Sequence, residues 1–229
     1  MTNESYAKIA ANITPDKSAS MDLRTENSKI LIEVLKLLDR NAKLYDASQK
    51  LLAQSYYHWL PDYFFTTPAS STGKYHPAFA NKRNGLMLHS LAVARIAIQL
   101  LDILTATDDE YKDFHNIVVC AAWLHDMLKY GDPYEYKSGQ FTVHDHPVIA
   151  AEFIEYKDTA DILKSYGFGY DDINAVSDLI RTHMGPYTTS KYSDVVLDPP
   201  KTALQVLLFQ ADFLASRKEN DIVKDVMDP

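Results

Sequence analysis

The chain has 229 residues, of which 46% are hydrophobic and 24% are charged. This is the composition of a globular protein that can bury one sizeable core, and it excludes a disordered chain. The formal net charge of −8 argues against a broad basic surface for duplex DNA or RNA. A small phosphate-bearing substrate remains compatible, because a metal ion and one or two lysines make a positive pocket inside an acidic protein.

Cysteine usage and the start of the chain bear on the compartment. Cys120 is the single cysteine, which excludes a disulfide framework and is typical of a reducing compartment. Its apolar neighbours favour a small core residue over a nucleophile. The first residues lack a basic region followed by an apolar segment, and we identify no apolar run of the length that spans a bilayer. We therefore expect a cytoplasmic protein with no membrane partner.

Apolar periodicity predicts a helical chain. Residues 1–20 are polar and mixed, so we expect a loose N-terminal arm there, followed by a single helical domain over 21–229. The polar and broken stretch 66–77 is either a plain surface connection or a functional loop. The predicted helices begin near Asp22 and then cover 47–59, 86–104, 109–129, 147–157, 171–184 and 202–218, with a turn-rich or hairpin-like segment over 134–143.

The adjacent pair His125 and Asp126 is the most informative feature of this pattern. The pair ends an apolar, helix-forming run at a point where a purely structural helix needs neither side chain. Burying an imidazole beside a carboxylate is costly unless a positive group satisfies both of them. A divalent metal ion is such a group, and it makes a metal-dependent hydrolase the leading interpretation.

Other histidines and aspartates also lie inside or at the ends of apolar predicted helices. One residue of this kind is more often a satisfied polar residue of the core, but six of them make that explanation uneconomical. Asp212 carries the most weight, because a carboxylate inside an apolar helix needs a partner. With the pair above, the set comprises His89, His125, Asp126, His146, His183 and Asp212.

The order of these residues resembles that of the HD-domain metal-dependent phosphohydrolases. The resemblance covers about residues 66–216 and leaves the N-terminal helices unexplained. Within that superfamily the motifs are most similar to the branch of bacterial 3′-to-5′ exoribonucleases and related phage proteins. The matching segments are Pro68-Ala69-Ser70, Gly85-Leu86-Met87-Leu88-His89, His125-Asp126-Met127-Leu128-Lys129, His146 to Glu152, Arg181-Thr182-His183-Met184-Gly185 and Gln210-Ala211-Asp212.

The resemblance implies an all-α HD-domain helical bundle with extra N-terminal helices. It also implies a first divalent ion held by His89, His125, Asp126 and Asp212, with Asp126 bridging to a second ion held by His146 and His183. Mixed imidazole and carboxylate ligands suit Mn²⁺, Fe²⁺, Co²⁺ or Ni²⁺ better than Mg²⁺. Met184 stands where many members with two ions carry a further histidine, so one or two ions remain open.

Several residues are candidates for direct roles in catalysis or substrate binding. Asp126 and Lys129 are the expected catalytic residues. Lys129 either compensates the negative charge of a phosphate or is a solvated lysine at the end of a helix. Lys74, His76 and Arg83 are candidates for phosphate contacts, because their loop precedes the first ligand helix. His144 and Asp145 adjoin His146 and either orient it or form a polar loop without a role.

We therefore expect a hydrolase that cleaves a nucleotide or another small phosphate ester with metal-activated water. Two alternatives stay open. One is a 3′-to-5′ exonuclease acting on single-stranded RNA or DNA. The other is a metal-stabilised binding or regulatory module without turnover, which Met184 and the altered residue Leu128 support. The oligomeric state and the identity of the base and sugar are open.

Overall fold

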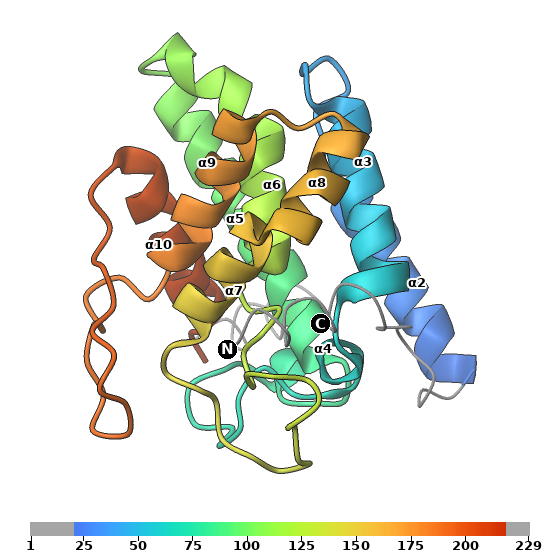
Figure 1. The fold of residues 1–229 in the computed structure, drawn as a ribbon, viewed down its shortest axis with the longest axis vertical. Coiled ribbons are helices and arrows are strands. Elements are labelled where there is room, and N and C mark those ends of the chain that lie inside the picture. Colours follow the sequence, from blue (N-terminus) through green and yellow to red (C-terminus); the bar gives the residue numbers. More distant parts are fainter. Residues whose placement is uncertain (1–20, 219–229) are drawn as a thin grey trace, which may run out of the picture.

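A computed structural model describes residues 21–218, and the predicted arm over residues 1–20 lies outside that range. The described part is built from helices and turns, which confirms the all-α prediction (Figure 1). Between residues 21 and 218 no strand forms, and one isolated bridge joins Ser190 to Ser193. The segment 134–143, predicted as turn-rich or hairpin-like, consists of turns.

The helices differ widely in length. In chain order they are α2 (Met21–Leu35), α3 (Tyr45–Gln54), α4 (Asp62–Thr66), α5 (Gly85–Thr105), α6 (His115–Leu124), α7 (His146–Glu155), α8 (Lys157–Tyr166), α9 (Tyr170–Arg181) and α10 (Ala203–Ala215). A π-helical turn over Ser55–Trp59 extends α3, and 3₁₀ turns form over Ala78–Ala80 and Asp109–Phe114.

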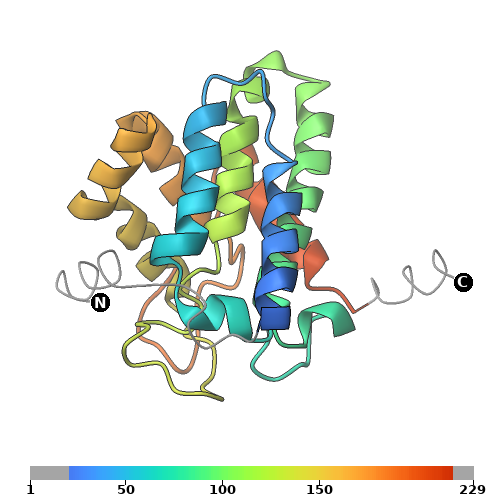
Figure 2. The same ribbon diagram turned by 90° about the vertical axis from the view of Figure 1, so that its right-hand side faces the viewer.

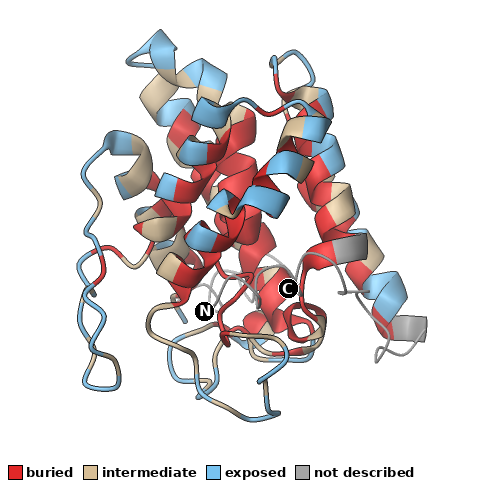
Figure 3. Ribbon diagram, viewed as in Figure 1, coloured by how far each residue is buried: buried red, intermediate tan, exposed pale blue. Residues whose placement is uncertain are grey.

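Helix α6 is the central element of the bundle. Every residue from Asn116 to Leu124 is buried, so this helix has no solvent-facing side (Figure 3). It packs against α3, α5, α9 and α10. A helix that is apolar all round requires such a complete covering, and its C-terminal end delivers the His-Asp pair into the interior.

The N-terminal helices extend the same core. Helices α2 and α3 lie side by side and cover α5 and α6 (Figure 2). Val34, Leu51 and Leu52 have no exposed surface and belong to one continuous buried cluster that also contains residues of α10. These helices are therefore a further layer of the bundle around α6.

Helix α5 corrects one expectation from the sequence. At 21 residues it is long and apolar enough to cross a membrane by length and composition, although we expected no such run. Half of its most apolar window is buried inside the molecule, where α5 packs against α6 and α10. The burial is that of a core helix, and a core helix passes the same test of length and composition.

One end of the bundle collects the ends of five elements. The first residues of α5 and α7 and the last residues of α6, α9 and α10 lie at the lower end in Figure 1, beside the loops 67–84 and 125–145. This follows from the chain running up through α5 and back down through α6. All six histidines and aspartates singled out in the sequence belong to these ends.

Candidate metal and active site

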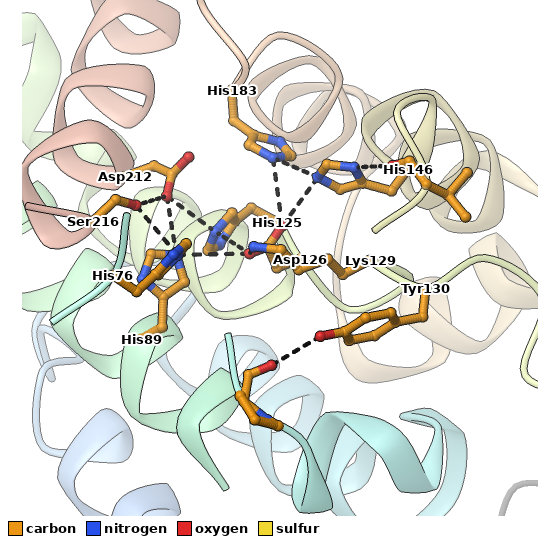
Figure 4. A network of polar contacts seen from close by, with 12 residues as sticks. His76, His89, His125, Asp126, Lys129, Tyr130, His146, His183, Asp212 and Ser216 are labelled. Atoms are coloured by element: carbon orange, nitrogen blue, oxygen red, sulfur yellow. Dashed lines mark hydrogen bonds and ion pairs between the residues drawn. The ribbon is translucent and has the colours of Figure 1, made fainter. Parts of the chain in front are cut away.

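The structure brings the six predicted ligand residues to one place. His89 comes from α5, His125 and Asp126 from the turn after α6, and His146 from the first residue of α7. His183 follows α9, and Asp212 lies in α10. Figure 4 shows their side chains converging on Asp126 from these separate elements. The four histidines and Asp126 are buried, while Asp212 is partly exposed.

Asp126 is the centre of the cluster, and each of its two carboxylate oxygens faces a different set of imidazoles. Oδ2 lies 3.3 Å from His125 Nε2 and 3.6 Å from His89 Nε2. Oδ1 lies 3.0 Å from His146 Nε2 and 3.6 Å from His183 Nε2. The arrangement is that of two donor sets that share one carboxylate.

Asp212 completes the first of these sets. Its Oδ1 lies 3.0 Å from His89 Nε2 and 3.8 Å from His125 Nε2. Three groups of three donors have atoms that all lie within 4.8 Å of one another: His89, His125 and Asp126; His125, His183 and Asp212; and Asp126, His146 and His183. Atoms that share a coordination sphere have separations of this size, because each lies about 2.0–2.2 Å from the ion.

Three of the histidines are oriented by the backbone just before them. His125 Nδ1 lies 2.7 Å from the carbonyl oxygen of Ala122, and His183 Nδ1 lies 2.7 Å from that of Ile180. Both carbonyls belong to the last turn of a helix, where no amide of the helix reaches them. His146 Nδ1 makes the same contact with Val143, also at 2.7 Å. Since Nδ1 donates its hydrogen to a carbonyl, Nε2 carries the lone pair that a metal ion needs.

The contact between His146 and His183 shows why a cation belongs there. Their Nε2 atoms are 3.1 Å apart. With both Nδ1 atoms donating to carbonyls, the two Nε2 lone pairs face each other in a buried site. Such a contact is favourable only when a proton or a metal ion lies between the nitrogens. The residues present therefore fit a divalent metal ion.

Burial and neighbouring charges set the protonation states. Burial lowers the pKa of His89 and that of His146, which keeps both rings neutral, as metal ligands must be. Burial also opposes ionisation of Asp126, but Lys129 and His125 outweigh it and hold the carboxyl pKa well below its usual range. For His125 the burial is outweighed by Asp126, so the pKa of that ring is raised.

Lys129 is a buried cation of the site. It is 8% exposed, and its Nζ lies 2.5 Å from Asp126 Oδ2. This burial excludes the alternative of a solvated helix-end lysine. The tight turns after α6 bring the two groups together, since the Lys129 amide bonds to the Asp126 carbonyl at 3.0 Å.

A cavity of about 580 Å³ opens onto the cluster. Asp126, Lys129 and His183 line it. Ser70 and His76 of the loop after α4 and Tyr187 of the segment after α9 line it as well. Helix α10 contributes Phe209, Asp212, Phe213 and, just after its end, Arg217. The volume lies within the range of small-molecule binding sites.

Comparison with protein-family models gives one match, to the HD domain, over residues 87–217. The match covers more than half of the chain and includes all six residues of the cluster. The chain belongs to the HD-domain family. No curated protein and no solved structure is similar enough to this chain to count as a match.

Members of the HD-domain family are typically metal-dependent hydrolases. In this HD domain the buried cluster of histidines and aspartates supplies groups that can hold a divalent metal ion. The matched range begins inside α5 and ends just after α10. Helices α2 to α4 are therefore the part of the described chain that precedes the HD domain.

Of the three loop residues predicted to contact phosphate, the structure places one at the cavity. His76 lines the cavity, with its ring centroid 4.8 Å from that of His89. Burial lowers the pKa of His76 to about 2, so it is a neutral hydrogen-bonding group. Lys74 and Arg83 are exposed and do not line the cavity. Lys74 instead lies over the ring of Tyr75, with its Nζ 4.8 Å from the ring centroid.

His144 also belongs to this HD-domain cavity. It lies in the cavity wall, and its Nε2 is buried without a hydrogen-bond partner in the structure. Asp145 directly precedes α7, and its carbonyl accepts a hydrogen bond from Ile149. Met184 lines the cavity as well, so a thioether faces the substrate space at the position after His183.

The tyrosines after the His-Asp turn have a structural role. Tyr63, Tyr130 and Tyr136 form an aromatic cluster with ring centroids 4.9–5.6 Å apart. The Tyr130 hydroxyl donates to the carbonyl of Pro68, and that of Tyr63 donates to the carbonyl of Gly131. The cluster thus ties the His-Asp turn to the start of the loop 66–77.

Two glycines allow the ligand-bearing turns to approach their neighbours. A Cβ on Gly85 would lie 2.1 Å from the carbonyl oxygen of Ala80, so only glycine fits where the loop meets α5. Gly185 has a φ of +61°, and a Cβ there would lie 2.3 Å from the ring of Phe209. This second contact holds the turn of His183 against α10 of Asp212.

The sequence interpretation missed Arg217 and the aromatic residues of α10. Arg217 follows the predicted ligand Asp212 by five residues, just after the end of α10, and it lines the cavity. A cation placed just beyond a ligand on an apolar helix is the signal that would have identified it.

Proposed function

We propose that this HD-domain protein is a metal-dependent phosphohydrolase that cleaves a nucleotide or another small phosphate ester. The observation that carries the proposal is the shared carboxylate, since both oxygens of Asp126 face imidazole Nε2 atoms at 3.0–3.6 Å. A cluster with a purely structural role would have no need to direct four imidazole nitrogens toward one buried carboxylate that opens onto a cavity.

The donor set favours the metals proposed from the sequence. Imidazole nitrogens outnumber carboxylates, which suits Mn²⁺, Fe²⁺, Co²⁺ or Ni²⁺ better than Mg²⁺. When bound, such an ion polarises a phosphoryl oxygen and makes water a nucleophile at neutral pH. His89, His125, Asp126 and Asp212 would hold one ion, and Asp126, His146 and His183 would hold a second.

The protein side chains would bind and orient the substrate. Lys129 lines the cavity beside Asp126 and would offset negative charge on the phosphate that is cleaved. His76 and Ser70 also line the cavity, and their side chains would donate hydrogen bonds to phosphate or sugar oxygens. The cavity of about 580 Å³ lies within the range of small-molecule sites, which supports a nucleotide as substrate.

Exposed aromatic side chains support a second candidate, a 3′-to-5′ exonuclease acting on single-stranded RNA or DNA. Tyr75 and Tyr187 line the cavity yet are 56% and 55% exposed. Aromatic faces at the mouth of a site stack on the bases of a strand that continues out of it. Strong salt dependence of binding would accompany this function, because neutralising several phosphates releases counterions.

The test is hydrolysis by the Mn²⁺-loaded protein of nucleoside mono- and triphosphates, cyclic nucleotides and a short single-stranded oligonucleotide. Asp126→Ala should lose turnover, whereas Asp109→Asn, which changes an exposed carboxylate paired with Lys112, should keep it. Far-UV circular dichroism and metal content are measured for each variant. Cleavage of the free nucleotides supports the first function, and cleavage of the oligonucleotide supports the second. Absence of turnover in metal-loaded protein would identify a binding module and overturn both.

A further inference from the structure

Arg217 is a cation of the cavity that the proposed chemistry does not use. It lies just after α10, partly buried, and it lines the cavity together with Lys129. Its Nε donates a hydrogen bond to the carbonyl of Phe213 at 3.1 Å. The centre of its guanidinium group lies 4.0 Å from the centroid of the Phe213 ring. The side chain is therefore held in one orientation from two directions.

The guanidinium group has no carboxylate partner within the part of the chain that the structure describes. The other partly buried arginine, Arg181, makes two hydrogen bonds to Glu155, and Lys129 is paired with Asp126. Among residues 21–218, the polar contact of the Arg217 side chain is the one from Nε to Phe213, and its two terminal nitrogens make no ion pair with an acidic side chain. A cation that is stacked on a ring, oriented by a hydrogen bond and not paired with an acid of the described chain is suited to bind an anion.

Its position relative to the metal ligands distinguishes it from Lys129. Arg217 follows Asp212 by five residues and lies beyond the end of α10 at Ala215. Ser216 lies between them, with its Oγ 3.4 Å from Asp212 Oδ1. Lys129, by contrast, lies directly against the shared carboxylate. The two cations thus mark two places in one cavity, one at the cluster and one beside it.

We propose that Arg217 binds a second anionic group of the substrate, next to the phosphate held at the metal ligands. This rests on the function proposed above and narrows its substrate to a compound with neighbouring phosphates. A nucleoside di- or triphosphate and a nucleic acid strand share that chemistry. The planar fork of arginine makes paired hydrogen bonds to phosphate oxygens, which a lysine cannot reproduce.

The direct test is binding of two probes that the enzyme cannot hydrolyse, measured by calorimetry on Mn²⁺-loaded protein. Methylenebisphosphonate has two neighbouring anionic groups, and methylphosphonate has one. Arg217→Gln should weaken binding of the bisphosphonate at least tenfold and change binding of the monophosphonate less than twofold. Arg217→Lys should lie between wild type and Arg217→Gln. Arg40→Gln, which removes an exposed guanidinium outside the cavity, should match wild type.

Steady-state kinetics then shows whether the second anionic group belongs to a nucleotide or to a nucleic acid strand. Arg217→Gln should raise KM for nucleoside diphosphates if the substrate is a nucleotide, or for a dinucleotide if it is a strand, with no matching rise for p-nitrophenyl phosphate. Equal loss for both phosphonates, or no loss for either, overturns the role of Arg217 while wild-type turnover leaves the hydrolase function standing. A wild-type protein that binds neither probe and hydrolyses nothing overturns both.

Discussion

At the scale of single residues, Lys129 and a metal ion would compete for the same oxygen of Asp126. Lys129 Nζ lies 2.5 Å from Oδ2, the oxygen that also faces His89 and His125. Without a metal ion, the lysine balances the negative charge of Asp126. An ion bound by that oxygen would take over this role. The lysine therefore stabilises the metal-free protein and becomes available to the substrate once the ion is bound.

Replacing Lys129 with methionine should separate these two roles. In EDTA the free energy of unfolding should fall by about 3 kcal/mol, because a buried carboxylate loses its counter-charge. Saturating Mn²⁺ should remove most of that loss, while hydrolysis should fall at least tenfold. Urea unfolding with and without metal measures the first effect. Equal destabilisation in both conditions would show that Lys129 contributes packing of its alkyl chain and not charge.

The predicted ligand residues that the structure brings together are those whose sequence environment is improbable for a polar side chain. His89 and Asp212 could be singled out because polar groups inside apolar helices need partners, and the structure places them 3.0 Å apart. Lys74 and Arg83 could not be judged in the same way. Their segment has no regular apolar spacing, and its path depends on close contacts such as that of Gly85 with Ala80, which periodicity does not report.

At the scale of elements, the turn after α9 depends on its contact with α10. Gly185 combines a positive φ with a backbone that touches the Phe209 ring. That contact fixes the distance between His183 on one element and Asp212 on the other. We therefore expect the backbone conformation at Gly185 to affect how the two side chains hold a metal ion.

Gly185→Ala should destabilise the protein and weaken metal binding together. The left-handed φ costs an alanine about 1–2 kcal/mol, and displacement of Phe209 should add to it. Gly139→Ala is the matched control, since Gly139 has a φ of +83° but nothing within 4 Å of an added Cβ. Thermal unfolding and Mn²⁺ titration measure both variants. If neither Gly185→Ala nor Gly139→Ala changed the affinity for Mn²⁺, the backbone at Gly185 would have no influence on metal binding.

Helix boundaries show where sequence patterns stop being informative. The predicted helix over 109–129 is a 3₁₀ turn, then helix α6, then a run of tight turns. Helix α6 ends where the His125 side chain bonds to the Ala122 carbonyl, which a continuing helix would use for its own backbone bond. Helix α8 was missed. It lies at the edge of the bundle and buries few side chains, among them Ala160 and Leu163, so its apolar stripe is short. The long periodic segments were predicted well because their packing repeats along the chain.

At the scale of the whole molecule, metal binding should raise the free energy of unfolding and the Tm. An ion that binds only the folded state adds about 2.7 kcal/mol when its free concentration is one hundred times Kd. For a protein of this size that corresponds to a rise in Tm of roughly 5–10 °C. Differential scanning fluorimetry with Mn²⁺ and with EDTA measures it. The double variant Asp126→Asn with Lys129→Met, which removes the carboxylate and its buried partner together, should show no rise; a rise equal to that of wild type would place the ion elsewhere.

Cys120 provides an independent measure of global opening. It lies on the fully buried helix α6, and burial raises the pKa of its thiol to about 12. At pH 8 its reaction with a disulfide reagent should be about 1000-fold slower than in urea-unfolded protein, since each pKa unit reduces the thiolate tenfold. The folded state favours the neutral thiol, so stability should also decline as pH rises from about 9 toward 12. Reaction in native buffer at the unfolded rate would show that α6 is accessible.

The histidine contacts with preceding carbonyls have a consequence for the choice of ion. Each of these three rings is oriented inside a four-residue fragment, 122–125, 143–146 or 180–183, whereas the spacing between fragments is set by the bundle. Small shifts of whole fragments can therefore adjust the size of the coordination shell without turning any ring. We expect a centre that loads several first-row ions with similar geometry, so that the supply of metal in the cell, and not the protein, decides which one is bound.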